Sequence, residues 1–133
     1  MRSRAPGRAL LVFAALSFAS ACASRGPDVE ALAAGIRAKM KLPYDVDADT
    51  RLEDVRAVSK TTLGYFLTLK NTTKATLDPK LGKLLQTNLR SNSCQNPSYI
   101  TIVKAGISVS IAYRTADQAD VVDVVITPRD CVF

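Results

Sequence analysis

The sequence predicts an α+β fold of two layers, in which helices cover one face of an antiparallel sheet of about four strands. Three observations carry this prediction. Four apolar-alternating segments fall into two pairs, each joined by a short polar turn, which is typical of β-hairpins. Segments with helical spacing precede the first pair and separate it from the second. Cys94 and Cys131 stand on either side of the second hairpin, which predicts one disulfide.

The N-terminal segment has the features of an export signal. Arg2, Arg4 and Arg8 form a positive region, residues 9–19 are apolar and uncharged, and small residues follow up to Ala23. An apolar run of this length is too short for a stable membrane span and is typical of a secretory signal peptide. We therefore expect a signal peptide over 1–21, a tether over 22–27, and a single α+β domain over 28–133.

Cys22 has two interpretations. Ordinary signal peptidase could cut before it, or the cysteine could be lipidated, because Ala19-Ser20-Ala21-Cys22 resembles the lipobox of bacterial lipoproteins. The usual lipobox has Leu where Ala19 stands. An odd cysteine in an exported protein requires an explanation, and pairing of Cys94 with Cys131 leaves Cys22 at the position of a lipid. We prefer lipidation of Cys22.

The charge balance does not indicate a nucleic-acid partner. The 133-residue chain carries a formal charge of +6, but residues 1–21 hold three of the 18 basic residues and none of the 12 acidic ones. The mature chain is thus close to +3. No block of like charge occurs, and basic and aromatic residues are not interleaved.

The first predicted helix spans residues 28–41. Asp28 can cap its N-terminus, an apolar stripe runs along one side, and Pro43 ends it, because the residue before a proline avoids helical geometry. Asp45, Asp47 and Asp49 then resemble the start of a calcium loop. The sixth position of that loop is Thr50 instead of Gly, so we favour an acidic, solvated entry to the first strand and expect no metal site.

Two strands and a second helix follow. Residues 52–58 and 63–70 predict a hairpin, and Asp78-Pro79 opens a helix that continues to about Asn92. Residues 99–105 are compatible with either a strand or a short helix capped by Ser98. We prefer the helix.

The final hairpin pairs residues 107–113 with 121–126. One sheet face, covered by the helices, is then expected to carry Leu63, Tyr65, Leu67, Ile107, Val109, Ile111, Tyr113, Val122, Val124 and Ile126.

The sequence contains no motif that indicates catalysis or cofactor binding. The chain contains no histidine, which excludes Ser-His-Asp and Cys-His arrangements and histidine metal sites. There is no CxxC pair and no glycine-rich phosphate loop, so we expect Cys94 and Cys131 to be structural, in keeping with an oxidising compartment. We therefore expect that the protein is not an enzyme and that it binds no cofactor.

Residues 43–131 resemble the α/β class of type II secretion pilotin lipoproteins at the level of pattern. The residues that carry this resemblance are, in chain order, Pro43, Asp47, Thr50-Arg51-Leu52, Val55, Leu63-Gly64-Tyr65, Leu69, Leu89, Cys94, the Gly106–Tyr113 strand and Cys131. The resemblance implies a non-catalytic pilot that binds a segment of an outer-membrane secretin in a helix-in-groove site. It implies transport to the periplasmic side of the outer membrane by a lipid on Cys22, which is followed by Ala23 instead of the Asp that retains lipoproteins at the inner membrane.

Two other functions stay open from the sequence. One is a periplasmic inhibitor or immunity protein that blocks a hydrolase, and the other is a structural envelope lipoprotein. Ordinary cleavage before Cys22 would instead give a soluble periplasmic or secreted protein. The residues do not indicate which surface would bind a partner.

Overall fold

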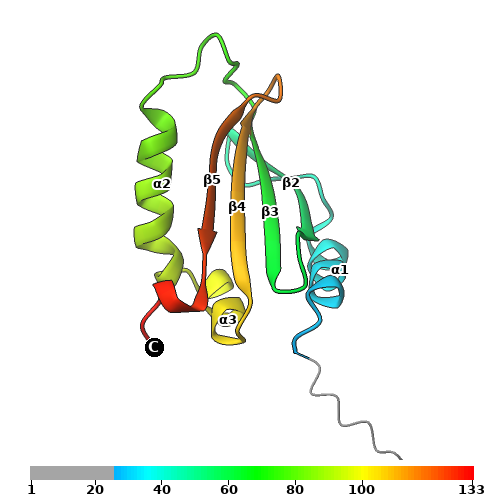
Figure 1. Cartoon of the computed structure of the whole chain (residues 1–133). Coiled ribbons are helices and arrows are strands. Elements are labelled where there is room, and N and C mark those ends of the chain that lie inside the picture. The colour runs from blue at the N-terminus through cyan, green and yellow to red at the C-terminus, as the bar shows by residue number, and fades with distance from the viewer. Residues whose placement is uncertain (1–25) are drawn as a thin grey trace, which may run out of the picture.

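The computed structural model describes residues 26–133, so the predicted export signal and Cys22 lie outside the described residues. A twisted sheet forms one layer, and three α-helices pack on or beside it (Figure 1). The elements, in chain order, are α1 (Val29–Met40), β1 (Tyr44–Asp45), β2 (Thr50–Ala57), β3 (Thr62–Leu69), α2 (Leu81–Asn92), η1 (Ser93–Gln95), α3 (Pro97–Lys104), β4 (Ser108–Thr115), β5 (Asp120–Ile126) and η2 (Pro128–Asp130).

The sheet order is β1-β2-β3-β4-β5. The predicted two-layer α+β class is confirmed, and both predicted hairpins, β2–β3 and β4–β5, are antiparallel pairs. Two details of the sheet differ from the prediction of about four antiparallel strands. The two-residue strand β1 adds a fifth strand at the edge, and the central strands β3 and β4 run parallel. The parallel pairing arises because α2 and α3 carry the chain back along the sheet before β4 begins.

The predicted inner face of the sheet is confirmed. Leu63 pairs with Val109 and Tyr65 with Ile111 across the parallel strands, so side chains of the same face meet along the sheet. Ile111 in turn pairs with Val124 on β5. Leu63, Val109, Ile111 and Val124 have no exposed surface and form the centre of the core.

Helix α1 covers the β2–β3 side of this face. The Asp28 side chain accepts a hydrogen bond from the Ala31 N–H at 3.1 Å, which confirms the predicted cap. Val29 and Ala33 are buried on the sheet. Arg37 donates from its guanidinium to the Val55 carbonyl on β2 at 2.6 Å, which fixes the helix to the outer part of the sheet.

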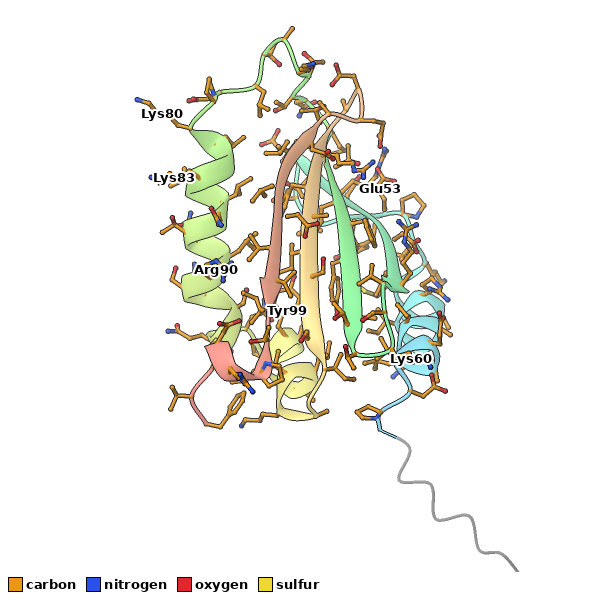
Figure 2. All side chains as sticks on the ribbon, in the orientation of Figure 1. Glu53, Lys60, Lys80, Lys83, Arg90 and Tyr99 are labelled. Carbon is orange, nitrogen blue, oxygen red and sulfur yellow. A yellow bond between two sulfur atoms is a disulfide. The ribbon has the colours of Figure 1, made fainter. Side chains whose placement is uncertain are left out.

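Helix α2 lies beside β5 and buries none of its residues fully. It begins at Leu81, later than the predicted start at Asp78-Pro79, because the Asp78 side chain accepts from the Lys80 N–H at 2.8 Å and closes a separate turn. At its first turn the helix backbone approaches β5 closely: a Cβ placed on Gly82 would lie 2.7 Å from the Val121 carbonyl oxygen. Lys80, at the N-cap of α2, and Lys83 and Arg90 of the helix are exposed (Figure 2).

Helix α3 settles the ambiguous segment in favour of the predicted helix. Its cap is Asn96 instead of Ser98, since the Asn96 side chain accepts from the Ser98 N–H at 2.9 Å while Pro97 occupies the first helical position. Gly106 follows the helix with φ +87°, a conformation that favours glycine.

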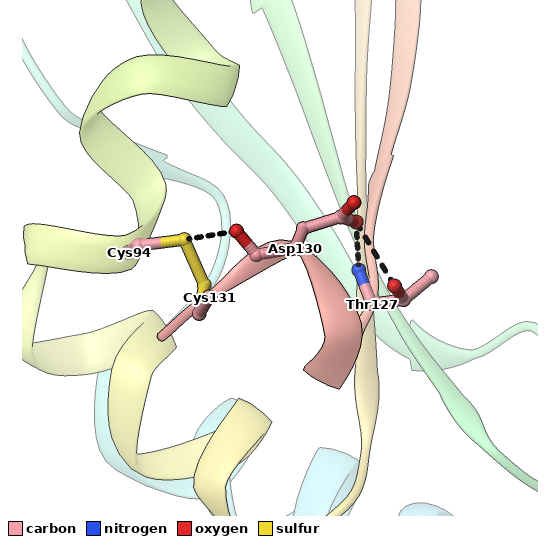
Figure 3. The surroundings of a disulfide bond; sticks show 4 residues. All are labelled: Cys94, Thr127, Asp130 and Cys131. Atoms are coloured by element: carbon pink, nitrogen blue, oxygen red, sulfur yellow. Dashed lines mark hydrogen bonds between the residues drawn. A yellow bond between two sulfur atoms is a disulfide. The ribbon is translucent and has the colours of Figure 1, made fainter. Parts of the chain in front are cut away.

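The disulfide joins the segment after α2 to the segment after β5, as predicted. Cys94 and Cys131 are bonded with a Cα–Cα distance of 5.4 Å. The Asp130 carbonyl oxygen lies 3.4 Å from the Cys94 sulfur, and Asp130 also accepts from the Thr127 N–H at 2.7 Å (Figure 3). The bond therefore holds the end of α2, the start of α3 and the chain after β5 together.

The three aspartates of the calcium-like segment are engaged separately. Asp47 accepts from the N–H groups of Asp49 and Thr50 at 2.8 Å, whereas Asp45 pairs with Lys70 at 3.2 Å. Over residues 26–133, no group of three or more acidic, cysteine or histidine side chains is arranged to hold a metal ion. Within that same range, no helix is both long enough and apolar enough to cross a bilayer.

Candidate binding groove

A groove lies between α1 and α3 above the inner face of the sheet. We call it the α1–α3 groove, and its cavity volume is about 450 Å³. Its apolar side chains come from three elements. They are Leu32, Ile36 and Met40 of α1, Tyr65 of β3, and Tyr99 and Ile102 of α3.

Two tyrosines give the groove its aromatic floor. Tyr65 belongs to β3 and Tyr99 to α3, and Tyr99 lies against the sheet (Figure 2). Their rings meet edge to face, with centroids 5.2 Å apart and an interplanar angle of 74°. This geometry is favourable for aromatic pairs and holds both rings in place.

Burial raises the pKa of the tyrosines in and near the groove above the ordinary value of a phenol. The pKa of Tyr99 is raised to about 12, mainly by burial and then by the nearby phenols of Tyr65 and Tyr113. Burial also raises the pKa of Tyr65. For Tyr113, burial and then the charge of Asp47 raise the pKa. The groove is thus uncharged at its floor around neutral pH.

The rim is polar, and two of its side chains, Asn96 and Thr101, already have hydrogen-bond partners. Asn96 caps α3 as described, and the Thr101 hydroxyl donates to the Pro97 carbonyl at 3.1 Å. Lys39 is the one charged side chain among the lining residues. A ligand would therefore be held mainly by apolar and aromatic contact, with a cation at one edge.

This groove is better suited to a ligand than the other hollows of the described chain. A depression of about 660 Å³ is lined by residues 26–30 and 57–61, where the chain enters the domain. Two further hollows lie on the opposite sheet face around Phe66 and Arg114. Of the four, the α1–α3 groove is the one whose walls come from two helices and whose two aromatic rings pack edge to face.

The sequence identified only part of this arrangement. Cys94 and Cys131, the predicted disulfide, are brought together between η1 and the chain after η2 and do not line the groove, whereas Cys22 lies outside the described residues. Tyr65 was expected in the core, and Tyr99 lay in the ambiguous segment. Periodicity placed Tyr65 on the correct face, but it contained no signal that α3 would leave that ring at the floor of a groove.

No protein-family model matches the sequence, and no curated protein matches it. Solved structures do share the fold. The pilotin EpsS of the Vibrio vulnificus type 2 secretion system matches with a TM-score of 0.60 at 15% identity, over 79% of this chain and 89% of that one. The type II secretion pilotin AspS of Vibrio cholerae matches with a TM-score of 0.58 at 19% identity, over 82% of this chain and 97% of that one.

The chain has the fold of type II secretion pilotins. The fold also occurs in PA3611 of Pseudomonas aeruginosa, with a TM-score of 0.56 at 11% identity, over 78% of this chain and 93% of that one. The resemblance to pilotins inferred from the sequence is therefore confirmed at the level of the fold.

Proposed function

We propose that this protein is a non-catalytic pilot that binds an apolar segment of a secretin in the α1–α3 groove. The aromatic floor of the groove is the observation that carries this proposal: Tyr65 and Tyr99 offer a fixed apolar surface between two helices. Apolar helical segments bind in such grooves through residues spaced three or four apart. The shared fold of the two pilotins supports a secretin as the source of the segment.

The proposed pilot is exported and carries a lipid on Cys22. The signal peptide over 1–21 and the lipobox-like residues before Cys22 support acylation of Cys22. An acyl chain contributes about 0.8 kcal/mol per buried methylene, which would hold the bound secretin segment at the periplasmic side of the outer membrane. Mass spectrometry of the membrane fraction tests this part: the mature N-terminus should be an acylated Cys22, and an unmodified chain in the soluble fraction would contradict it.

The binding test compares two charge insertions of equal size. Thr101→Arg places a long cationic side chain at an exposed rim position of the groove, and Gln86→Arg places it at an exposed position of α2. Binding of secretin C-terminal peptides is measured by titration calorimetry. We expect Thr101→Arg to weaken binding at least about tenfold, equivalent to 1.4 kcal/mol, and Gln86→Arg to leave it nearly unchanged.

Two outcomes would contradict the proposal. One is the absence of peptide binding by the wild-type chain together with normal secretin assembly in a deletion strain. The other is equal binding by both arginine variants, which would place the peptide elsewhere on the molecule. A thermal unfolding curve for each variant shows that any lost affinity is not lost folding.

A further inference from the structure

Exposed apolar side chains gather at one end of the domain. We call it the tether end, and it consists of residues 26–29, 58–61, 104–107 and 127–133. Val58, Val132 and Phe133 are 48%, 98% and 61% exposed there. Val132 and Phe133 follow one another at the end of the chain, and Phe133 lies against Lys104 at the end of α3, whereas Val58 lies in the β2–β3 turn. Exposed apolar side chains of this kind are favoured by contact with an apolar surface.

The segments of the tether end are adjacent in the fold. Residues 26–30 and 57–61 line one depression, and the Ser108 N–H donates to the Thr61 carbonyl at 2.9 Å. On the other side, the Lys104 ammonium lies 5.2 Å from the Phe133 ring centroid. Figure 1 shows the start of α1, the end of α3 and the end of the chain at the same end of the sheet.

Chain length brings this end to the proposed lipid. Cys22 precedes Gly26 by four positions. An extended chain spans at most about 3.6 Å per residue, so an acylated Cys22 lies within roughly 14 Å of Gly26. A strand of eight residues is about 27 Å long, so the far end of the sheet is beyond this reach.

Charge does not drive this contact. Lys60, Lys104 and Arg129 are exposed at the tether end, where Asp28 and Asp130 offset two of these charges, and Glu30 lies just beyond it. The net charge of this end is therefore small, so attraction to anionic lipid would be weak. An interfacial contact at this end must therefore depend on Val58, Val132 and Phe133.

We propose that the tether end rests on the bilayer, with Phe133 and Val132 in the membrane interface and the strands directed away from it. This inference rests on the proposed acylation of Cys22. The apolar contact adds a second membrane signal to the lipid and fixes the orientation of the domain. Helix α2 is the rival surface, because Leu84 is 57% exposed there, directly after Lys83 and one helical turn after Lys80.

Because the chain contains no tryptophan, a single introduced tryptophan reports its own surroundings. The full lipoprotein is prepared as Phe133→Trp and, as the matched variant, Leu84→Trp. Both are inserted by their lipid into vesicles of phosphatidylethanolamine and phosphatidylglycerol that carry brominated acyl chains. We expect a blue-shifted emission and strong quenching for Phe133→Trp, and neither for Leu84→Trp. High salt should leave the difference unchanged.

Quenching at position 84 and not at 133 would overturn the inference in favour of a domain lying on α2. If neither variant shows a blue shift or quenching in the vesicles, the domain does not touch the bilayer, and the inference is overturned. Mass spectrometry and flotation of each preparation separate these results from failure of the lipid itself. A chain without an acyl group that does not float would remove the anchor, and with it this inference, while peptide binding in the groove could still be measured.

Discussion

Tyr99 connects the groove to the stability of the protein at high pH. Its pKa is raised from 10.0 to about 12 because burial disfavours the phenolate. The unfolded chain therefore loses this proton before the folded chain does, so the free energy of unfolding falls as the pH rises from about 10 to about 12. Below pH 10 the contribution is fully present.

A Tyr99→Phe variant tests this relation. It keeps the ring and removes the ionisable group, so its free energy of unfolding should fall less steeply above pH 10 than that of the wild type. Urea unfolding at a series of pH values measures both slopes, and one pKa unit corresponds to about 1.4 kcal/mol. Parallel slopes for the two proteins would show that the Tyr99 hydroxyl is not shielded from water.

Arg37 secures α1 to an outer strand. Its hydrogen bond to the Val55 carbonyl is 2.6 Å long and partly buried, and such charge-assisted bonds contribute about 1.5–3 kcal/mol. We expect Arg37→Ala to lower the free energy of unfolding by about 1–2 kcal/mol, whereas Lys39→Ala on the same helix should have an effect below about 0.5 kcal/mol. Urea denaturation of both variants checks this difference. Equal losses would show that the guanidinium contributes only as surface charge.

For single residues, the sequence predicted local helix caps better than tertiary contacts. Asp28 capped α1 as expected, because aspartate followed by an apolar stripe is a strong local signal. Asn96 capped α3 in place of Ser98, because both are favourable cap residues and Pro97, which lies between them, occupies the first helical position. The contact of Arg37 with β2 is tertiary and could not be read from local pattern.

At the scale of elements, α2 is the least firmly packed helix. It buries no residue fully, and its attachments are a row of half-buried leucines, the Gly82 approach to β5 and the disulfide at its end. Amphipathic spacing in the sequence predicted the helix correctly. It could not show that the helix would lie at the side of the sheet, because the same stripe fits a fully covered face.

Two glycine substitutions separate helix propensity from contact. Alanine is favoured over glycine within helices by about 1 kcal/mol. Gly35→Ala on α1 meets no atom within 4 Å and should raise the free energy of unfolding by about 0.5–1 kcal/mol. Gly82→Ala meets the Val121 carbonyl at 2.7 Å, a backbone atom that cannot rotate away, and should lower it by about 1–2 kcal/mol. Stabilisation by both substitutions, measured by urea unfolding, would contradict the close packing of α2 on β5.

The disulfide is predicted to act mainly on α2 and on the chain after β5. Replacing both Cys94 and Cys131 by serine should lower the free energy of unfolding by about 2–4 kcal/mol, because the bond closes a long loop. Native-state hydrogen exchange should show the largest loss of protection in α2, with β3 and β4 affected only through global unfolding. A uniform loss over the whole sheet would contradict a local role.

For the whole molecule, the parallel centre of the sheet was the main feature beyond sequence reasoning. Alternation of apolar residues determines which face a strand presents, and this prediction held for β3, β4 and β5. It is identical for parallel and antiparallel neighbours, so it could not reveal that the α2–α3 crossover returns the chain to run parallel with β3. The α1–α3 groove depends on that crossover, because it places Tyr99 over Tyr65.

The proposed binding of a secretin segment in the α1–α3 groove can be observed most directly by two-dimensional NMR of the isotope-labelled protein during titration with a secretin C-terminal peptide. We expect the signals of Ile36, Tyr65 and Tyr99 to shift with a common saturation curve. The signals of Phe66 and Arg114 on the opposite sheet face should stay in place. Shifts confined to that opposite face, or none at saturating peptide, would contradict binding in the groove.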